Sequence, residues 1–423
     1  MLKNKTDDYI NKELLHFVTV GSVDDGKSTL IGRLLYDSKS IVEDQLMAIW
    51  QASEKRGDTN VNLALLTDAL GAEQEQGITI DVAYRYFTTQ KRKFIISDTP
   101  GHIQYTRNMI TGASTADIAL ILIDARKGVV EQTRRHSLIV SMLKIQHLVV
   151  CVNKMDLVDY REDIFELIRS NFNNYLSGLD FLNSIFIPIC ALNGDNVVNP
   201  SVKMPWYKGG SLINLLENIS ISRDENLTDG RFPVQYVLRS NDGFHDYLAY
   251  AGRVAGGVFK AGDKVMVLPS KQITKISSID FYESNVEEAF PPMSVSMRFA
   301  DDLEVNRGDM IVREDSIPEI SKEFDVMLCW CNVKKLVPGA KYVLKHTTRE
   351  VHCYIKDLLY IIDVNTRRKI EGIQEVGLND IARVSIKTLQ PLFFDKYKVN
   401  RATGSIILID ELTNETVGAG MII

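Results

Sequence analysis

The chain has 423 residues, of which 45% are hydrophobic and 25% are charged, with a formal net charge of −6 at pH 7. This is ordinary globular usage, and the length suffices for two or three domains. Residues 1–8 are polar rather than signal-like, and the longest apolar runs, such as 118–123, stop at a charge, which argues against a membrane-spanning or targeting segment. The five cysteines without a secretory signal indicate reduced thiols, so we expect a cytoplasmic protein.

The first predicted strand and helix flank a glycine-rich loop. Residues 16–20 are apolar and β-branched, residues 29–35 have helical apolar spacing, and Gly-Ser-Val-Asp-Asp-Gly-Lys-Ser lies between them at 21–28. Such a loop lets backbone N–H groups and the helix N-terminus converge on a phosphate. Lys27 would reach the β- and γ-phosphates, and the Ser28 hydroxyl would ligate Mg²⁺. A glycine-rich turn with an exposed lysine is the alternative for the loop taken alone.

The next candidate segment, 77–81, follows an acidic stretch at 71–76. Its members are Gly77, Ile78, Thr79, Ile80 and Asp81. We expect Thr79 to close on Mg²⁺ only when the γ-phosphate is present, so the segment would act as a switch.

A buried strand is predicted at 93–97, and it ends at Asp98-Thr99-Pro100-Gly101-His102. A carboxylate at the carboxyl end of such a strand faces the nucleotide crevice, so Asp98 would orient a water on Mg²⁺. The N–H of Gly101 would bond the γ-phosphate. His102 is the candidate for positioning the attacking water, and a purely structural histidine is the alternative.

Two further loops are expected to bind the base of the nucleotide. The strand 148–152 ends at Asn153-Lys154-Met155-Asp156. The Asp156 carboxylate can accept both donors on the guanine edge, Lys154 can lie over the ring, and Asn153 can tie this loop to the phosphate loop. After the strand 185–189, the N–H of Ala191 could bond guanine O6. A surface turn is the alternative for Asn-Lys-Met-Asp alone.

The domain organisation follows from the spacing of strands and helices. Residues 1–222 alternate apolar strands with amphipathic helices, which predicts a doubly wound α/β P-loop domain with a mostly parallel sheet. A polar, turn-rich stretch follows near 222–230, and short strands then recur between turns. A second break near 315–319 gives two small β-barrel domains, at 231–315 and 317–423.

The order and spacing of the five loops resemble GTPases of the translation-factor class, in which Val23 and Ile78 would flank His102 as an apolar gate. More closely, the chain resembles the large subunit of bacterial sulfate adenylyltransferase over nearly its whole length. The stretches that carry this resemblance are 21–35, 77–87, 104–109, 124–129, 204–207 and 232–237. The chain departs from the usual pattern at Ile103, where relatives often carry an acidic residue, and at Cys190, where a serine is common.

The resemblance implies a GTPase, with GTP and Mg²⁺ as cofactors, that is paired with a small catalytic subunit in a heterodimer or a higher assembly of it. That partner would make adenosine 5′-phosphosulfate and pyrophosphate from ATP and sulfate, the first step of sulfate assimilation, and GTP hydrolysis would drive the reaction. With His102 as the catalytic residue, and Ser28 and Thr79 on Mg²⁺ with Asp98 acting through water, the expected GTP-binding residues are Gly21, Ser22, Val23, Asp24, Asp25, Gly26, Lys27, Ser28, Thr29, Asp98, Thr99, Pro100, Gly101, His102, Asn153, Lys154, Met155, Asp156, Cys190, Ala191 and Leu192.

Two other functions remain open. A translation elongation factor that delivers aminoacyl-tRNA would need a cationic surface, whereas the net charge is −6 and the basic cluster around 126–135 is typical of a solvated helix face. We therefore do not expect nucleic acid or a membrane as a partner. A regulatory GTP sensor that switches without driving turnover is the third possibility.

Overall fold

The computed structural model describes most of the chain, and its contacts divide the chain into two compact units. The first comprises Met1–Ser222 with Val364–Thr366, and the second comprises Arg223–Asp363 with Arg367–Ile423. The described residues are 12–41, 43–56, 63–66, 79–221, 226–241, 246–282 and 284–423.

The described residues of the first unit form a six-stranded sheet in the order β2-β3-β1-β4-β5-β6. All neighbouring strands are parallel except β2, which runs antiparallel to β3. The strands are β1 (Leu14–Val20), β2 (Ala83–Thr88), β3 (Lys93–Asp98), β4 (Ile118–Asp124), β5 (His147–Asn153) and β6 (Asn183–Pro188). Since β4 and β5 are buried along their whole length, they consist of nearly continuous apolar runs.

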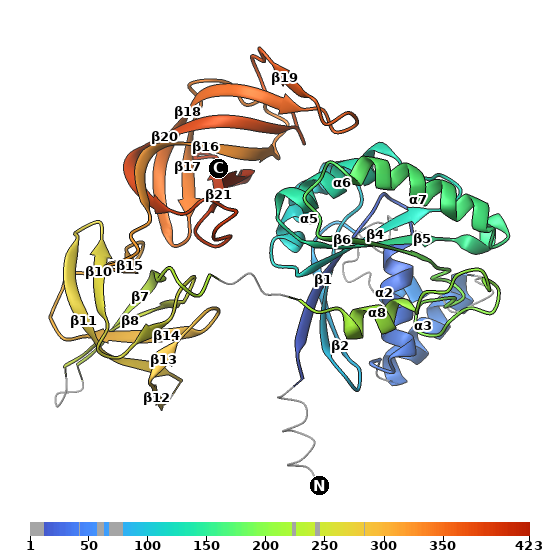
Figure 1. Ribbon diagram of the computed structural model, residues 1–423, viewed down its shortest axis with the longest axis horizontal. Helices are drawn as coiled ribbons and strands as arrows, with labels where there is room; N and C mark the ends of the chain where they lie inside the picture. Colours follow the sequence, from blue (N-terminus) through green and yellow to red (C-terminus); the bar gives the residue numbers. More distant parts are fainter. Residues whose placement is uncertain are drawn as a thin grey trace, which may run out of the picture. The chain divides into compact units, whose positions relative to one another are not determined.

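Helices cover both faces of this sheet (Figure 1). Leu30 and Leu34 of α2 pack with Leu212 and Leu216 of α8 in the core on one face, while α5, α6 and α7 lie on the other. The described helices are α2 (Lys27–Asp37), α3 (Glu43–Arg56), α5 (Thr106–Ala113), α6 (Glu131–Met142), α7 (Glu162–Leu176) and α8 (Leu212–Asn218), with short 3₁₀ turns η1 (Leu63–Leu66), η2 (Ile103–Tyr105) and η3 (Met155–Val158).

The parallel arrangement determines where the predicted loops meet. Strands β1, β3, β4 and β5 end at Val20, Asp98, Asp124 and Asn153. Because parallel strands direct their carboxyl ends to one edge of the sheet, the segments that follow them gather there.

The described part of the second unit contains two closed barrels. In the first, the ring β10-β15-β7-β8-β14-β11 is closed by pairing of β10 with β11. Its strands, with the short β9, β12 and β13, are β7 (Arg231–Asn241), β8 (Asp246–Arg253), β9 (Phe259–Lys260), β10 (Lys264–Leu268), β11 (Gln272–Phe281), β12 (Ser284–Val286), β13 (Glu288–Ala289), β14 (Ser294–Phe299) and β15 (Met310–Arg313).

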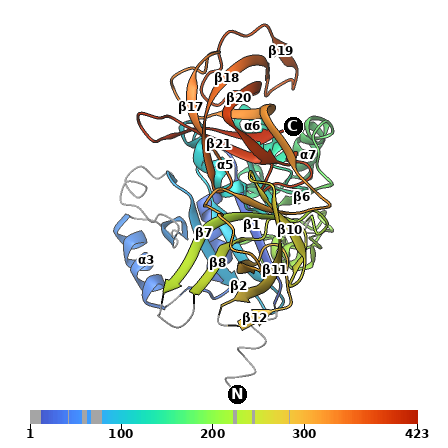
Figure 2. The same ribbon diagram turned by 90° about the vertical axis from the view of Figure 1, so that its left-hand side faces the viewer.

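The second barrel is the ring β17-β21-β22-β16-β20-β18, closed by pairing of β17 with β18. The far end of β18 continues past the ring to pair with β19, as Figure 2 shows. The strands are β16 (Glu319–Trp330), β17 (Lys341–His346), β18 (Arg349–Ile362), β19 (Lys369–Glu371), β20 (Ile381–Phe394), β21 (Ser405–Ile409) and β22 (Thr416–Ile422).

The two barrels are joined by buried contacts. Arg231 of the first forms a two-pronged ion pair with Asp395 of the second, at 2.9 Å for both nitrogen–oxygen distances. Phe393 packs with Leu268 and Met310 in a small apolar cluster beside it. The predicted fold class, an α/β nucleotide-binding domain followed by two β-barrels, is confirmed.

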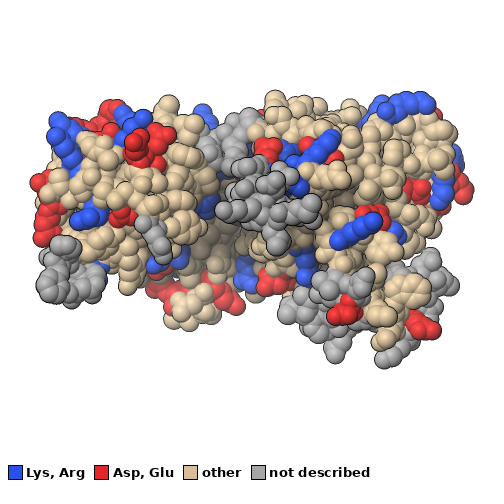
Figure 3. Space-filling model, turned by 90° about the horizontal axis from the view of Figure 1, so that it is seen from below, with Lys and Arg blue, Asp and Glu red and all other residues tan. Residues whose placement is uncertain are grey.

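Acidic and basic side chains intermingle on the described surface drawn in Figure 3. Among the described residues, no helix combines the length and apolarity that crossing a bilayer requires.

Candidate nucleotide-binding site

The phosphate-loop candidate turns sharply between β1 and α2. Gly26 precedes the first residue of α2 and has a left-handed backbone, with φ of 94°. A Cβ at this position would collide with the side-chain amide of Asn153, so both the conformation and the space require glycine. The loop therefore lies directly against the carboxyl end of β5.

The ammonium of Lys27 lies inside this loop. Its Nζ donates to the carbonyls of Gly21, at 3.1 Å, and Ser22, at 2.9 Å, and the side chain is buried. Burial lowers the Lys27 pKa, while the nearby carboxylates of Asp25 and Asp98 oppose that shift. A cation held among backbone groups at a helix N-terminus is suited to bind a polyphosphate.

The Asp98–His102 segment packs against the same loop. Asp98 is buried at the end of β3, and the Thr99 hydroxyl donates to the Thr19 carbonyl at 2.6 Å. A Cβ on Gly101 would lie 2.6 Å from the Gly21 oxygen, so only glycine permits this approach. The structure thus brings together the two segments expected to hold the phosphates.

His102 caps the η2 turn. Its Nδ1 accepts the backbone N–H of Gln104 at 3.3 Å, and its ring lies 5.9 Å from that of Tyr105. Since Nδ1 accepts, the proton of a neutral imidazole belongs on Nε2. In this tautomer His102 can donate a hydrogen bond to a water.

The candidate switch is described only from Thr79 onward, and Gly77 and Ile78 lie outside the described residues. Asn108 of α5 donates to the Ile80 carbonyl at 2.8 Å, and Asp81 accepts the N–H of Val82 at 2.7 Å. The end of the segment is thereby anchored to the helix that follows Asp98–His102.

Asn153 joins the phosphate loop to the loop after β6. Its amide donates to the Asp25 carbonyl at 2.8 Å and accepts the N–H of Ala191 at 3.0 Å. A bond from Ala191 to guanine O6 would have to compete with this contact. Arg33 of α2 adds a second connection, because its guanidinium donates to the carbonyls of Ala191, at 3.2 Å, and Leu192.

Cys190 contacts the residue expected to read the base. Its thiol donates to Oδ1 of Asp156 at 3.0 Å. Burial and then this hydrogen bond raise the pKa of Cys190 to about 12, so the thiol stays protonated and remains a donor. The cysteine thus orients Asp156, where the family resemblance leads one to expect a serine.

Asp124 and Arg33 also belong to this site, although no sequence motif pointed to either of them. Asp124 is the last residue of β4, pairs with Asn153 of β5, and is buried. Its carboxylate lies 3.0 Å from Lys154 Nζ and 2.7 Å from Arg126 Nη2. The position of Asp124 at the end of a buried parallel strand could have pointed to it, because the same position identified Asp98 as a candidate.

The described residues contain no group of three or more His, Cys, Asp or Glu side chains that could hold a metal ion. Mg²⁺ in nucleotide sites instead takes few protein ligands and keeps waters and phosphate oxygens. The Ser28 hydroxyl in the first turn of α2, with the buried Asp98 carboxylate on the neighbouring strand, fits that chemistry.

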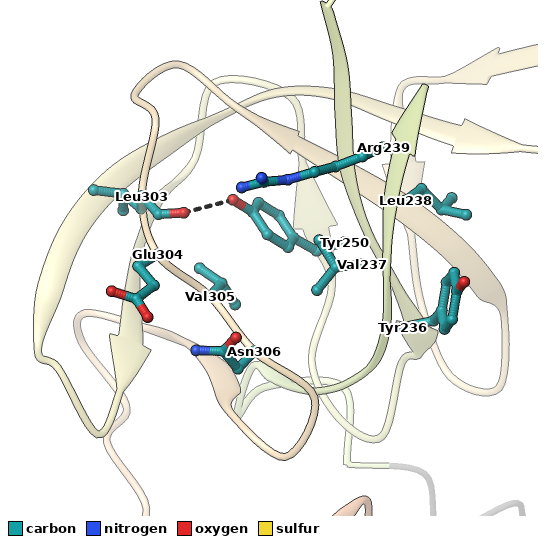
Figure 4. Close-up of a pocket in the computed structure, with 9 residues that line it drawn as sticks. All are labelled: Tyr236, Val237, Leu238, Arg239, Tyr250, Leu303, Glu304, Val305 and Asn306. Carbon is teal, nitrogen blue, oxygen red and sulfur yellow. Dashed lines mark hydrogen bonds between the residues drawn. The ribbon is translucent and has the colours of Figure 1, made fainter. Parts of the chain in front are cut away.

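A separate cavity of about 730 Å³ lies in the first barrel (Figure 4). The Tyr250 hydroxyl inside it donates to the Leu303 carbonyl at 2.8 Å, and the Arg239 guanidinium points toward this bond. No sequence motif predicted this cavity. Its lining residues are Tyr236, Val237, Leu238, Arg239, Tyr250, Leu303, Glu304, Val305 and Asn306.

Comparisons with family models agree with this arrangement. The model described as "Elongation factor Tu GTP binding domain" matches residues 12–228, and the model described as "GTP-eEF1A C-terminal domain-like" matches residues 323–423. Among solved structures, the S. cerevisiae Ski7 GTPase-like domain, bound to GDP and inorganic phosphate, is similar with a TM-score of 0.54 and 16% identity, covering 100% of this chain and 99% of that one. That likeness concerns the fold alone.

Curated proteins are much more similar in sequence. The chain is 52% identical to "Sulfate adenylyltransferase subunit 1" of Cellvibrio japonicus over 415 residues, which cover 97% of this chain and 87% of that protein. It is 54% identical to the "Bifunctional enzyme CysN/CysC" of Mycobacterium tuberculosis over 412 residues, which cover 97% of this chain and 67% of that protein.

Proposed function

The chain belongs to the family of sulfate adenylyltransferase subunit 1, and from this premise we propose that GTP hydrolysis at its nucleotide site drives adenylyl transfer from ATP to sulfate in a separate catalytic subunit. It is a GTPase subunit of the elongation-factor class with a role in sulfate activation. The products of the partner's reaction would be adenosine 5′-phosphosulfate and pyrophosphate.

The observation that carries the nucleotide assignment is the double contact of Asn153. One side-chain amide holds the phosphate loop, through the Asp25 carbonyl, and the loop after β6, through the Ala191 N–H. Asp156 follows three residues beyond Asn153, and Cys190 of the loop after β6 holds one of its carboxylate oxygens. Such a carboxylate pairs with the N1–H and N2–H₂ donors of guanine, whereas adenine offers no matching pair, which supports GTP over ATP.

For hydrolysis we assign roles to groups near the phosphate loop. Lys27 would neutralise the β- and γ-phosphates, and Ser28 with Thr79 would ligate Mg²⁺, with Asp98 acting through a bound water. The ion, when bound, supplies charge stabilisation on the phosphate oxygens. His102, protonated on Nε2, would donate to the attacking water and orient it rather than remove its proton.

Coupling to a partner needs a segment that senses the γ-phosphate. Thr79 and Ile80 lead directly into β2, and the Asn108 contact to Ile80 ties them to α5. A change at the γ-phosphate would therefore reach both β2 and α5, which a partner subunit can contact. Because a phosphosulfate anhydride forms uphill from ATP and sulfate, only a nucleotide that is hydrolysed can sustain its net formation over many turnovers.

The test is reconstitution with the small catalytic subunit. We expect the two chains to co-purify, and radiolabelled adenosine 5′-phosphosulfate to accumulate far beyond one equivalent with GTP but not with GDP. The matched control is Lys27→Ala, which should form the complex but show no increase in adenosine 5′-phosphosulfate when GTP is added.

Three outcomes would contradict the proposal. Equal accumulation with a nonhydrolysable GTP analogue over many turnovers would indicate a sensor. Retention of aminoacyl-tRNA on a filter would indicate an elongation factor. Failure of the pure chain to bind GTP in the presence of Mg²⁺ would remove the nucleotide site itself.

A further inference from the structure

We infer that Asp124, which lies outside the predicted nucleotide loops, is a positioning residue that fixes the ammonium of Lys154 and thereby holds the stem of Lys154 against the guanine ring. The inference rests on the proposed function, because it concerns the same nucleotide site. It assigns part of the nucleotide affinity to a residue on β4, a strand that carries none of the predicted loops.

The contact follows from strand register. Asp124 pairs with Asn153 across β4 and β5, so its side chain lies beside the first residue after β5, which is Lys154. Nζ of Lys154 is 3.0 Å from Asp124 Oδ2 and also donates to the Asp24 carbonyl of the phosphate loop. The ammonium is thus held at two points, one on β4 and one on the phosphate loop.

The backbone of Lys154 gives this side chain little freedom of its own. Lys154 has φ of 63°, a left-handed conformation that a non-glycine residue adopts only when surrounding contacts impose it. Its carbonyl also receives the N–H of Leu157 at 3.0 Å at the start of η3. With the backbone fixed, the direction of the stem depends on where the ammonium is anchored.

Asp124 is an unusual anchor because its carboxylate is completely buried, while Lys154 is 23% exposed and Arg126 is 48% exposed. Burial alone would raise the pKa of Asp124, but hydrogen bonds from Arg126 and Lys154 outweigh it and hold the pKa well below its usual range. A buried carboxylate that stays charged attracts an ammonium much more strongly than a solvated one does.

Arg126, which is more exposed than Lys154, also binds the Asp124 carboxylate. Its Nε and Nη2 lie 3.1 Å and 2.7 Å from the two Asp124 oxygens. Removing Arg126 leaves the contact between Asp124 and Lys154 in place, whereas changing Asp124 removes both contacts. The two variants therefore separate an effect through Lys154 from an effect on the turn after β4.

Loss of the anchor has a specific consequence. Without the Asp124 charge, the Lys154 ammonium keeps only its contact with the Asp24 carbonyl, so Lys154 rotates into solvent more readily and nucleotide binding must then order a long side chain. Lys154 would contact the face of the ring and not its hydrogen-bonding edge. Affinity for GDP and IDP should therefore fall by the same factor, unlike a change at Asp156, which alters their ratio because hypoxanthine lacks the N2 donor.

The experiment measures the affinity and dissociation rate of fluorescent GDP, with IDP as competitor, in a double-mutant cycle. Asp124→Asn should weaken GDP binding by about ten- to a hundredfold and leave the GDP:IDP ratio within about twofold. Lys154→Met should weaken it comparably, and Asp124→Asn added to Lys154→Met should change it by less than about twofold. Arg126→Ala should stay within about threefold of the unsubstituted chain.

Each other result overturns the inference. An equal loss from Asp124→Asn in the presence and absence of Lys154 would show that Asp124 acts independently of it. A loss from Arg126→Ala as large as from Asp124→Asn would assign the effect to the turn. Unchanged binding by Asp124→Asn would show no role. If the unsubstituted chain failed to bind GDP, the proposed function itself would fail, and that result is distinct from all three.

Discussion

Replacing Cys190 tests how the carboxylate of Asp156, which we propose to bind the guanine edge, is held. In Cys190→Ala, Asp156 loses the thiol donor at 3.0 Å from its Oδ1. Hydrogen bonds to charged groups contribute about 1.5–3 kcal/mol, and a thiol is a weaker donor than a hydroxyl. We take about 1 kcal/mol, which corresponds to roughly a fivefold loss of GTP affinity.

Cys190→Ser is the matched control, because a hydroxyl at the same position can donate to the same oxygen. We expect its GTP affinity to stay within about twofold of the unsubstituted chain. Isothermal titration with GTP in Mg²⁺ buffer measures both variants. The reasoning is refuted if alanine binds GTP as tightly as cysteine, or if serine and alanine lose affinity equally.

The raised pKa of Cys190 makes a separate pH prediction. Folding raises the thiol pKa from 9.0 to about 12, so the folded state retains the proton more strongly than the unfolded state. The resulting stabilisation is fully present below about pH 9 and is lost as the pH rises toward 12. Chemical unfolding at pH 8 and pH 10 should show the difference between the unsubstituted chain and Cys190→Ala shrinking at the higher pH, and a constant difference would contradict this assignment.

Five further substitutions test the site and the barrels. Lys27→Ala should abolish tight GTP binding in titration calorimetry, because it removes the cation inside the loop, and unchanged affinity would reject that role. His102→Ala should slow single-turnover hydrolysis by about 10²- to 10⁴-fold with binding largely intact, and lost binding would mark it as structural. Asp156→Asn should exchange guanine for xanthine preference in competition assays, since an amide can donate to the extra carbonyl. Arg231→Met should destabilise the second unit by about 3–5 kcal/mol in denaturant unfolding, because it leaves the largely buried Asp395 carboxylate with the Thr403 hydroxyl but without a counter-charge, and the added change Asp395→Leu should restore most of the loss.

The sequence was sufficient for the fold class and for the order of the loops because that information is local. A glycine-rich turn between a strand and a helix, or an Asn-Lys-Met-Asp run after a buried strand, is recognisable within ten residues. The parallel strands then bring such segments to one edge of the sheet. The residue roles within the loops remain predictions for the experiments above.

Contacts between distant segments could not be predicted in this way. Arg33 and the Ala191 carbonyl are separated by 158 residues, and nothing in either neighbourhood indicates the other. The strand-end position of Asp124 was visible, but its pairing with Lys154 depends on the register of β4 and β5. In the barrels, alternation predicted strands without indicating which of them pair, because closure is set by contacts across the whole unit.

The helix α2 begins at the phosphate loop, and nearly two turns further along Arg33 donates to the carbonyls of Ala191 and Leu192. The base end and the phosphate end of a guanine nucleotide would therefore both be held through one rigid helix. Tilting this helix would loosen base-side and phosphate-side contacts in a single motion, so GDP should leave without passing through a half-bound intermediate. A protein that catalyses nucleotide exchange would then need to bind only α2 to release GDP from the whole site.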